Sequence, residues 1–213
     1  MSQPRNRVRE LREILPGLLH ARVHDDRLDF RSDAFACQDA DGRRVWVDPL
    51  PLEPALEEAA GAVEAVVLSG AFHQRAAWEF RRRQGCPVLL PEGAAATEEP
   101  PDAGYRPGDA LPGGLRAVDA PGPTSPHVSF LFEAGGRRVL YLGDLLVRAG
   151  EEPWCFVPAA HQDDPARSRE SVRRLLDFGP EVLLSAHGEP QLGGAMAALE
   201  QALREDRELD LPS

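Results

Sequence analysis

The sequence predicts an α/β protein built from two related halves. A near-repeat is the main observation: residues 42–48 read Gly-Arg-Arg-Val-Trp-Val-Asp, and residues 136–144 read Gly-Arg-Arg-Val-Leu-Tyr-Leu-Gly-Asp. After a helical stretch, each copy is followed by a second apolar run with a Leu-Ser step, at residues 66–73 and 182–187. Strands that alternate with helices in this way indicate α/β layering. Because Asp and His end strands in both halves, we expect them to converge on one site between the halves.

The first half has clear turn and helix signals after an ambiguous start. Residues 7–20 mix helical spacing with a Pro16-Gly17 break, so helix and strand both stay open there. Residues 34–37 and 44–47 flank Asp39-Ala40-Asp41-Gly42, which predicts a hairpin. Residues 51–60 and 74–84 are expected to be helical, with Gly85 as the cap of the second helix.

The second half repeats this alternation. Residues 91–112 are rich in Pro, Gly, Ala and acidic residues, and we expect a surface excursion rather than a domain boundary. Residues 128–132 and 138–142 should pair as strands. A long helix is expected over residues 166–178, ended by Gly179-Pro180, and a last helix over residues 194–206. Since no linker separates two cores, a single domain over residues 1–213 is expected.

Composition narrows the classes of partner. A formal net charge of −11 argues against nucleic acid or an anionic membrane as the main partner, which leaves a small-molecule substrate or ligand; the oligomeric state stays open. No run of 18 apolar residues and no signal segment is present, so a soluble, cytoplasmic protein is expected. The three cysteines share no close spacing and are expected to be buried thiols, with Cys86 packed at the start of a short buried strand.

The order and spacing of these segments resemble the metallo-β-lactamase superfamily, from about Leu15 to Leu203. Residues 45–49, Val-Trp-Val-Asp-Pro, are similar to the hairpin end before the first site loop of that family. Residues 139–144 resemble the strand whose Gly-Asp step supplies a bridging carboxylate, and residues 170–190 resemble the last helix, strand and His-Gly ligand loop. The resemblance implies a four-layer αββα sandwich of two pseudo-repeated halves, and hydrolysis at a divalent metal.

The metal-binding signature, however, is degenerate. The loop that reads Thr-His-x-His-x-Asp-His in the family reads Ser-Gly-Ala-Phe-His-Gln-Arg over residues 69–75, so its four ligand positions are lost and His73 falls at a variable position. In the next ligand loop Pro123 replaces the metal histidine, and His127 matches a histidine that is normally not a ligand. Of the usual ligand set, the resemblance leaves only Asp144 and His187.

A reduced metal site therefore needs a recruited ligand. A catalytic zinc usually has three protein ligands and an open position. His73, or less readily His127, would have to join Asp144 and His187 to hold one divalent metal (Zn, Fe or Mn), and a site without metal stays open. In that case His187 is expected to donate to Asp144 as a His-Asp pair. Asp144 and Asp48 would then hold turns or neighbouring backbone amides.

The remaining candidates belong to the surroundings of the site. His161 lies in a region that borders the substrate cleft in the family that the chain resembles, and Trp154 is either a pocket wall or a core anchor. A surface or edge role is expected for His20 and His24.

Three functions are compatible with these residues. The first is a diverged hydrolase of a small ester, thioester, lactone or phosphoester with a reduced metal site. The second is a catalytically inactive pseudoenzyme that keeps the pocket as a metabolite- or partner-binding module. The third is a metal-free acid/base enzyme that uses Asp144 and His187.

Overall fold

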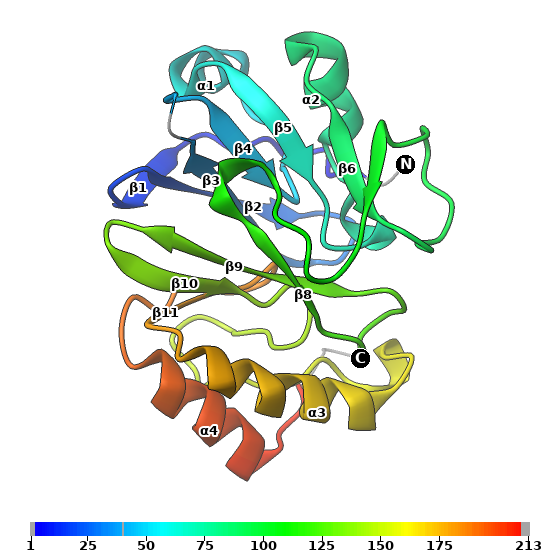
Figure 1. Cartoon of the computed structure of the whole chain (residues 1–213), viewed down its shortest axis with the longest axis vertical. Helices are drawn as coiled ribbons and strands as arrows, with labels where there is room; N and C mark the ends of the chain where they lie inside the picture. The colour runs from blue at the N-terminus through cyan, green and yellow to red at the C-terminus, as the bar shows by residue number, and fades with distance from the viewer. Residues whose placement is uncertain (1–2, 40, 210–213) are drawn as a thin grey trace.

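The computed structural model describes residues 3–39 and 41–209 and has four layers (Figure 1). Two β-sheets face each other in the middle, helices α1 (Pro54–Ala60) and α2 (Ala77–Gln84) cover the outer face of one sheet, and helices α3 (Pro165–Leu175) and α4 (Ala195–Glu205) cover the other. The αββα sandwich implied by the resemblance is thereby confirmed. All four helices expected from the sequence are present. Gly85, in the left-handed conformation at φ 67°, caps α2 as expected.

The first sheet has seven strands in sequence order. They are β1 (Leu11–Leu15), β2 (Leu18–Asp25), β3 (Phe30–Gln38), β4 (Arg44–Val47), β5 (Val63–Val67), β6 (Val88–Pro91) and β7 (Ala103–Tyr105). The ambiguous segment 7–20 is a hairpin, because Pro16-Gly17 forms the turn between β1 and β2 with Gly17 at φ 78°. The excursion 91–112 also differs from expectation: it contains β7, which extends the sheet beside β6 and buries Tyr105.

The second sheet has four strands in the order β11-β10-β9-β8. These are β8 (Arg116–Asp119), β9 (Val128–Ala134), β10 (Arg137–Tyr141) and β11 (Val182–Leu184). The two copies of the near-repeat form β4 and β10, so they lie in separate sheets as the two-halves prediction requires. In each half the repeated strand pairs in parallel with the next strand, β5 or β11, so the ends that carry Asp and His meet at one edge.

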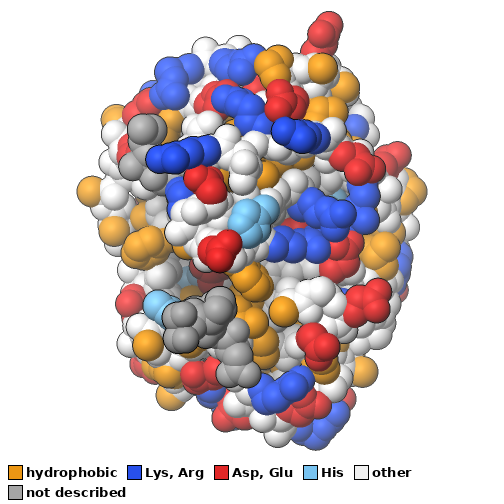
Figure 2. Space-filling model, turned by 180° about the vertical axis from the view of Figure 1, so that it is seen from behind, with side chains coloured by type: hydrophobic (Ala, Val, Ile, Leu, Met, Phe, Trp, Pro, Cys, Tyr) orange, Lys and Arg blue, Asp and Glu red, His pale blue; other side chains and the backbone are white. Residues whose placement is uncertain are grey.

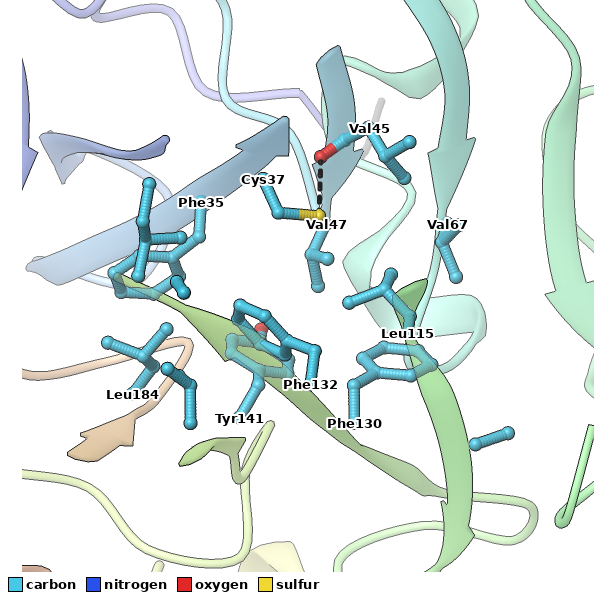
Figure 3. Packing of buried hydrophobic residues seen from close by; sticks show 14 of the residues in the cluster. Phe35, Cys37, Val45, Val47, Val67, Leu115, Phe130, Phe132, Tyr141 and Leu184 are labelled. Carbon is cyan, nitrogen blue, oxygen red and sulfur yellow. Dashed lines mark hydrogen bonds between the residues drawn. The ribbon is translucent and has the colours of Figure 1, made fainter. Parts of the chain in front are cut away.

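Aromatic and aliphatic side chains together fill the space between the sheets (Figure 3). Tyr141 of β10 stacks on Phe130 of β9, with ring centroids 6.0 Å apart, and meets the edge of Phe35 of β3 at 5.9 Å. The ring of Tyr141 is fully buried, so burial fixes the direction of its hydroxyl. That hydroxyl reaches Asp48 at the end of β4, and the core thereby positions a polar group of the site.

The cysteines agree with the sequence-based expectation of buried thiols. Cys37, Cys86 and Cys155 are buried thiols, and burial raises the pKa of Cys86, which precedes β6, to about 11. Arginine and acidic side chains are interspersed over the face drawn in Figure 2. Within residues 3–39 and 41–209, no helix has the length and apolar character needed to cross a bilayer.

Candidate metal centre

Three side chains from strand ends converge as the sequence predicted. His73 ends a short 3₁₀ turn, η1 (Ala71–His73), in the loop after β5; Asp144 follows β10, and His187 follows β11. The distance from His73 Nε2 to Asp144 Oδ2 is 3.0 Å, and that from His187 Nε2 to Asp144 Oδ1 is 3.6 Å. One ligand atom from each residue lies within 4.8 Å of the others. The three side chains line a cleft of about 800 Å³.

A buried carboxylate orients His73. His73 Nδ1 lies 2.9 Å from Asp48 Oδ2 and 2.8 Å from Ser69 Oγ, and the same carboxylate accepts bonds from Ser69 N at 2.8 Å and from the Tyr141 hydroxyl at 2.5 Å. Asp48 therefore holds a backbone amide, as expected, and also turns Nε2 of His73 toward Asp144. Burial by itself lowers the pKa of His73, but the carboxylates of Asp144 and Asp48 outweigh it and raise this pKa to about 9.

His187 has a different partner from the one expected for a metal-free His-Asp pair. Its Nδ1 lies 2.6 Å from the carbonyl oxygen of Arg31 and donates to it, so Nε2 carries the lone pair on the side of Asp144. Burial lowers the pKa of His187, which keeps the ring neutral. The alternative that His187 donates to Asp144 is thus wrong. The backbone carbonyl of Arg31 accepts the ring N–H, and the 3.6 Å from His187 Nε2 to Asp144 Oδ1 is too long for a hydrogen bond.

Asp144 has one carboxylate oxygen that accepts no hydrogen bond from the described residues. Its Oδ2 pairs with Nε2 of His73, while Oδ1 is buried and has no hydrogen bond to any residue in the described part of the chain. Burial raises the pKa of this carboxyl, but the neighbouring imidazoles outweigh burial and hold the pKa well below its usual range. An ionised oxygen that faces two imidazoles and lacks a donor is a group that still needs a cation or a donor.

His127 supports Asp144 and leaves no nitrogen for a metal. Its Nδ1 donates to the carbonyl oxygen of Ala120 at 2.8 Å, and its Nε2 accepts from the backbone N–H of Asp144 at 3.1 Å. Gly143 makes this approach possible, because a Cβ at its φ of 60° would lie 2.3 Å from His127 Nε2. His127, the less favoured recruit, is therefore a positioning residue for Asp144.

Arg75 is a buried cation that the sequence analysis did not single out as functional. It stands at the last of the four lost ligand positions and is 2% exposed. Its Nη1 donates to the carbonyl oxygens of Asp33 at 2.8 Å and Asp48 at 3.2 Å, and its Nη2 lies 3.4 Å from His187 Nε2. The guanidinium ties together three segments that carry the site. The sequence feature that could have identified Arg75 is its position at a ligand site of the degenerate loop.

A second group that the sequence analysis missed is the buried carboxylate of Asp33. Its Oδ2 accepts from the backbone N–H of Gly188 at 2.9 Å, and its Oδ1 lies 2.6 Å from His20 Nε2. The expectation of a surface or edge role for His20 is therefore wrong, because His20 is 1% exposed and lies in β2, which is flanked by β1 and β3. His24 does lie at the surface, beside Asp29.

The two expected pocket residues lie in different places. His161, in a 3₁₀ turn (Ala159–His161), lines the cleft together with the three converging side chains. Trp154 is 3% exposed and packs in the core under α3 and α4, and it does not line the cleft. Of its two alternatives, the structure places Trp154 as a core anchor.

The donor set fits one divalent metal ion. Two imidazoles, each with Nδ1 held by an oxygen, and one carboxylate make up a set typical of catalytic sites with open positions, and His73 would give up a proton to bind the ion. The observation that supports such a cation is the Oδ1 of Asp144, which is buried without a hydrogen bond among the described residues. A second ion does not fit, because the guanidinium of Arg75 lies beside His187 and Pro123 stands at a ligand position.

Comparisons with known proteins agree with this architecture. The family model described as the metallo-beta-lactamase superfamily matches residues 53–187, more than half of the chain. A metallo-beta-lactamase from Pontibacter korlensis aligns at 18% identity with a TM-score of 0.74, over 93% of this chain and 98% of that one. ETHE1 from Myxococcus xanthus aligns at 18% identity with a TM-score of 0.63, over 91% and 92% of the two chains.

A third solved structure adds a metal-bound neighbour. TTHA1623, solved in a di-iron-bound form, aligns at 24% identity with a TM-score of 0.60, over 79% of this chain and 93% of that one. A search of curated proteins gives no match to the sequence. At these identities the structural likeness shows the fold alone, whereas the family match covers the strands and loops that carry Asp144 and His187. The chain belongs to the metallo-beta-lactamase superfamily.

Proposed function

We propose that the protein is a hydrolase of a small ester, thioester, lactone or phosphoester, with one divalent metal held by His73, Asp144 and His187. The observation that carries this proposal is the convergence of three ligand atoms within 4.8 Å, beside a buried carboxylate oxygen without a hydrogen bond among the described residues. Zinc, iron and manganese are the candidate ions, and iron gains support from the di-iron form of the neighbour TTHA1623. The cytoplasm stays the predicted location.

The chain's own residues would prepare the site for such an ion. When bound, a divalent metal polarises a substrate carbonyl or phosphoryl oxygen and lowers the pKa of water. Asp48 holds the Nδ1 proton of His73, so Nε2 is directed at the centre and would present a lone pair there once it loses its proton. The carbonyl oxygen of Arg31 does the same for His187, and His127 fixes the backbone of Asp144. These contacts keep the three ligands in place before a substrate enters the cleft.

Hydrolysis tests the proposal. Protein stripped with a chelator is reloaded with Zn²⁺, Fe²⁺ or Mn²⁺ and assayed on 4-nitrophenyl acetate, an acetyl thioester, a lactone and a phosphodiester. We expect at least one class to be cleaved in a metal-dependent manner, and Asp144→Ala and His73→Gln to abolish this cleavage. His24→Gln is the control, because His24 lies at the surface. Cleavage by the stripped protein or by Asp144→Ala at the rate of the metal-loaded native protein would contradict the proposal.

A metal-free binding module is the second candidate, and the charges in the site favour it. Asp48 and Asp144 are held ionised, while protonated His73 and Arg75 supply two positive charges among them. The buried site is therefore electrically balanced without a metal. In this alternative the cleft binds a metabolite or partner with no turnover, and the stripped and metal-loaded proteins bind it equally.

A further inference from the structure

The mouth of the cleft exposes large apolar side chains. In the described part of the chain, the exposed large hydrophobic residues are Leu28, Phe72 and Leu192, with 55%, 69% and 41% of their surface accessible. Leu28 and Phe72 both line the cleft that contains the candidate metal ligands, and Leu192 does not. Apolar surface left in water beside a polar centre costs free energy and is typical of ligand-binding sites.

Phe72 is placed for contact with a bound molecule by its position in the ligand loop. It directly precedes His73 in η1, and His73 is buried against Asp48 and Asp144 while Phe72 is exposed. Phe72 also stands where the family resemblance places a metal histidine, so an apolar ring occupies a position that otherwise carries a polar ligand. Phe72 and His73 nevertheless line the same cleft, so the ring of Phe72 faces the space that a molecule bound there would occupy.

The rest of the lining continues this apolar surface. Half of the lining residues are apolar, and they come from separate segments: Leu28 and Phe30 from the β2–β3 turn and β3, Val147, Val157 and Pro158 from the loops after β10, and Leu209 near the end of the described chain. Phe30 also packs near the ring of His187, with centroids 6.1 Å apart. The apolar surface therefore extends from the mouth of the cleft to a candidate ligand.

We propose that the cleft selects substrates that carry an alkyl or aryl group next to the reacting carbonyl or phosphoryl group, with that apolar group packed against Phe72 and Leu28. This inference rests on the proposed function for the identity of the reacting group, but the apolar subsite can be tested without turnover. The occupant is a small molecule because the apolar surface is continuous with the ligands, whereas a protein partner would need a larger exposed patch than these separate side chains supply.

Binding of inert ketones isolates the subsite from catalysis. Straight-chain methyl ketones from 2-butanone to 2-decanone carry a carbonyl and no bond that a hydrolase cleaves, and their Kd values are measured by ligand-observed NMR. We expect Kd to fall about fourfold for each added methylene until the subsite is filled. Phe72→Ser should weaken binding of 2-decanone by about tenfold, and Phe72→Leu should retain most of it.

Leu192→Ser is the matched control, because Leu192 is also exposed and lies outside the cleft. A Kd that is independent of chain length, or an equal loss in Leu192→Ser and Phe72→Ser, would overturn the subsite. Sedimentation of the native protein and of Phe72→Ser checks the other occupant: a dimer that Phe72→Ser dissociates would assign this surface to a second copy of the chain and overturn the proposal. Ketone binding without ester hydrolysis would contradict the proposed function and leave the subsite standing.

Discussion

His73 shows how a single displaced histidine is turned into a ligand candidate. The sequence places it one residue beyond a family ligand position, and the structure fixes it between two carboxylates, at 2.9 Å from Asp48 and 3.0 Å from Asp144. Convergence of the strand ends was expected, but the direct contact of Asp48 with His73 Nδ1 was not, because the sequence assigned Asp48 only to turns or backbone amides. The carboxylate of Asp48 at Nδ1 therefore helps to raise the pKa of His73 and also orients its ring so that Nε2 faces Asp144.

Without metal, His73 should make stability depend on alkaline pH. The folded pKa of His73 is about 9, above its unfolded value of about 6.5. Its contribution to the free energy of unfolding is therefore fully present below about pH 6.5 and is lost as the pH rises through about 9. Urea unfolding of stripped protein between pH 6 and pH 10 should show this loss, and His73→Gln should flatten the profile. An identical pH profile in His73→Gln would contradict this assignment.

Asp48→Asn should weaken the site without removing a ligand. The amide cannot match the charge of the carboxylate beside His73 Nδ1, so the pKa of His73 should fall in the stripped protein, as followed by NMR titration of its ring proton. Metal affinity should fall by about 10- to 100-fold, the usual effect of removing the partner of a histidine ligand. Unchanged values for both the pKa and the metal Kd would show that Asp48 does not orient His73.

At the scale of elements, the ends of strands carry the site and distant strands hold it in place. The ends of β5, β10 and β11 were predictable from apolar runs that stop at Asp or His. The support of the His187 loop was not, because Asp33 of β3 reaches Gly188 across 155 residues of sequence. Alternating patterns show that a strand has a buried face, but they do not show which loop of the other sheet covers its polar residues.

Asp33→Asn should therefore be strongly destabilising. Asp33 is fully buried and pairs with His20, with the guanidinium of Arg31 and with the backbone of Gly188. Breaking a buried ion pair costs about 3 to 5 kcal/mol, which chemical denaturation measures directly. The exposed pair His24 and Asp29 offers a matched control, since Asp29→Asn should leave stability unchanged. Equal effects of the two substitutions would mean that Asp33 contributes no buried pairing.

At the scale of the whole molecule, the sequence predicted the fold better than the site. The near-repeat and the alternation of strands and helices predicted an α/β protein of two halves, because apolar periodicity reports burial, and the family resemblance supplied the αββα sandwich. The first hairpin and β7 were the weak points, since short strands with Pro and Gly have little periodicity. Arg75 was overlooked because an arginine is not a metal ligand, although its position in the degenerate loop marked it.

The net charge of the molecule is compatible with a metal that enters from solution. The chain carries a formal charge of −11, and the site itself is balanced by Arg75 and protonated His73. Metal binding therefore requires His73 to lose its proton, so affinity should increase with pH until the pH exceeds the pKa of His73, about 9. Titration with Zn²⁺ at pH 6.5 and pH 8.5 checks this direction, and tighter binding at the lower pH would contradict it.

Metal content is the most direct test of the central claim. Protein purified without chelator, supplemented with Zn²⁺, Fe²⁺ or Mn²⁺ and then gel-filtered is analysed by mass spectrometry, together with Asp144→Ala and His187→Ala. The three-ligand site predicts about one ion per chain for the native protein and almost none for either variant, since each loses a ligand. Less than about a tenth of an equivalent in the native protein after supplementation, or the same content in all three proteins, would contradict the metal centre.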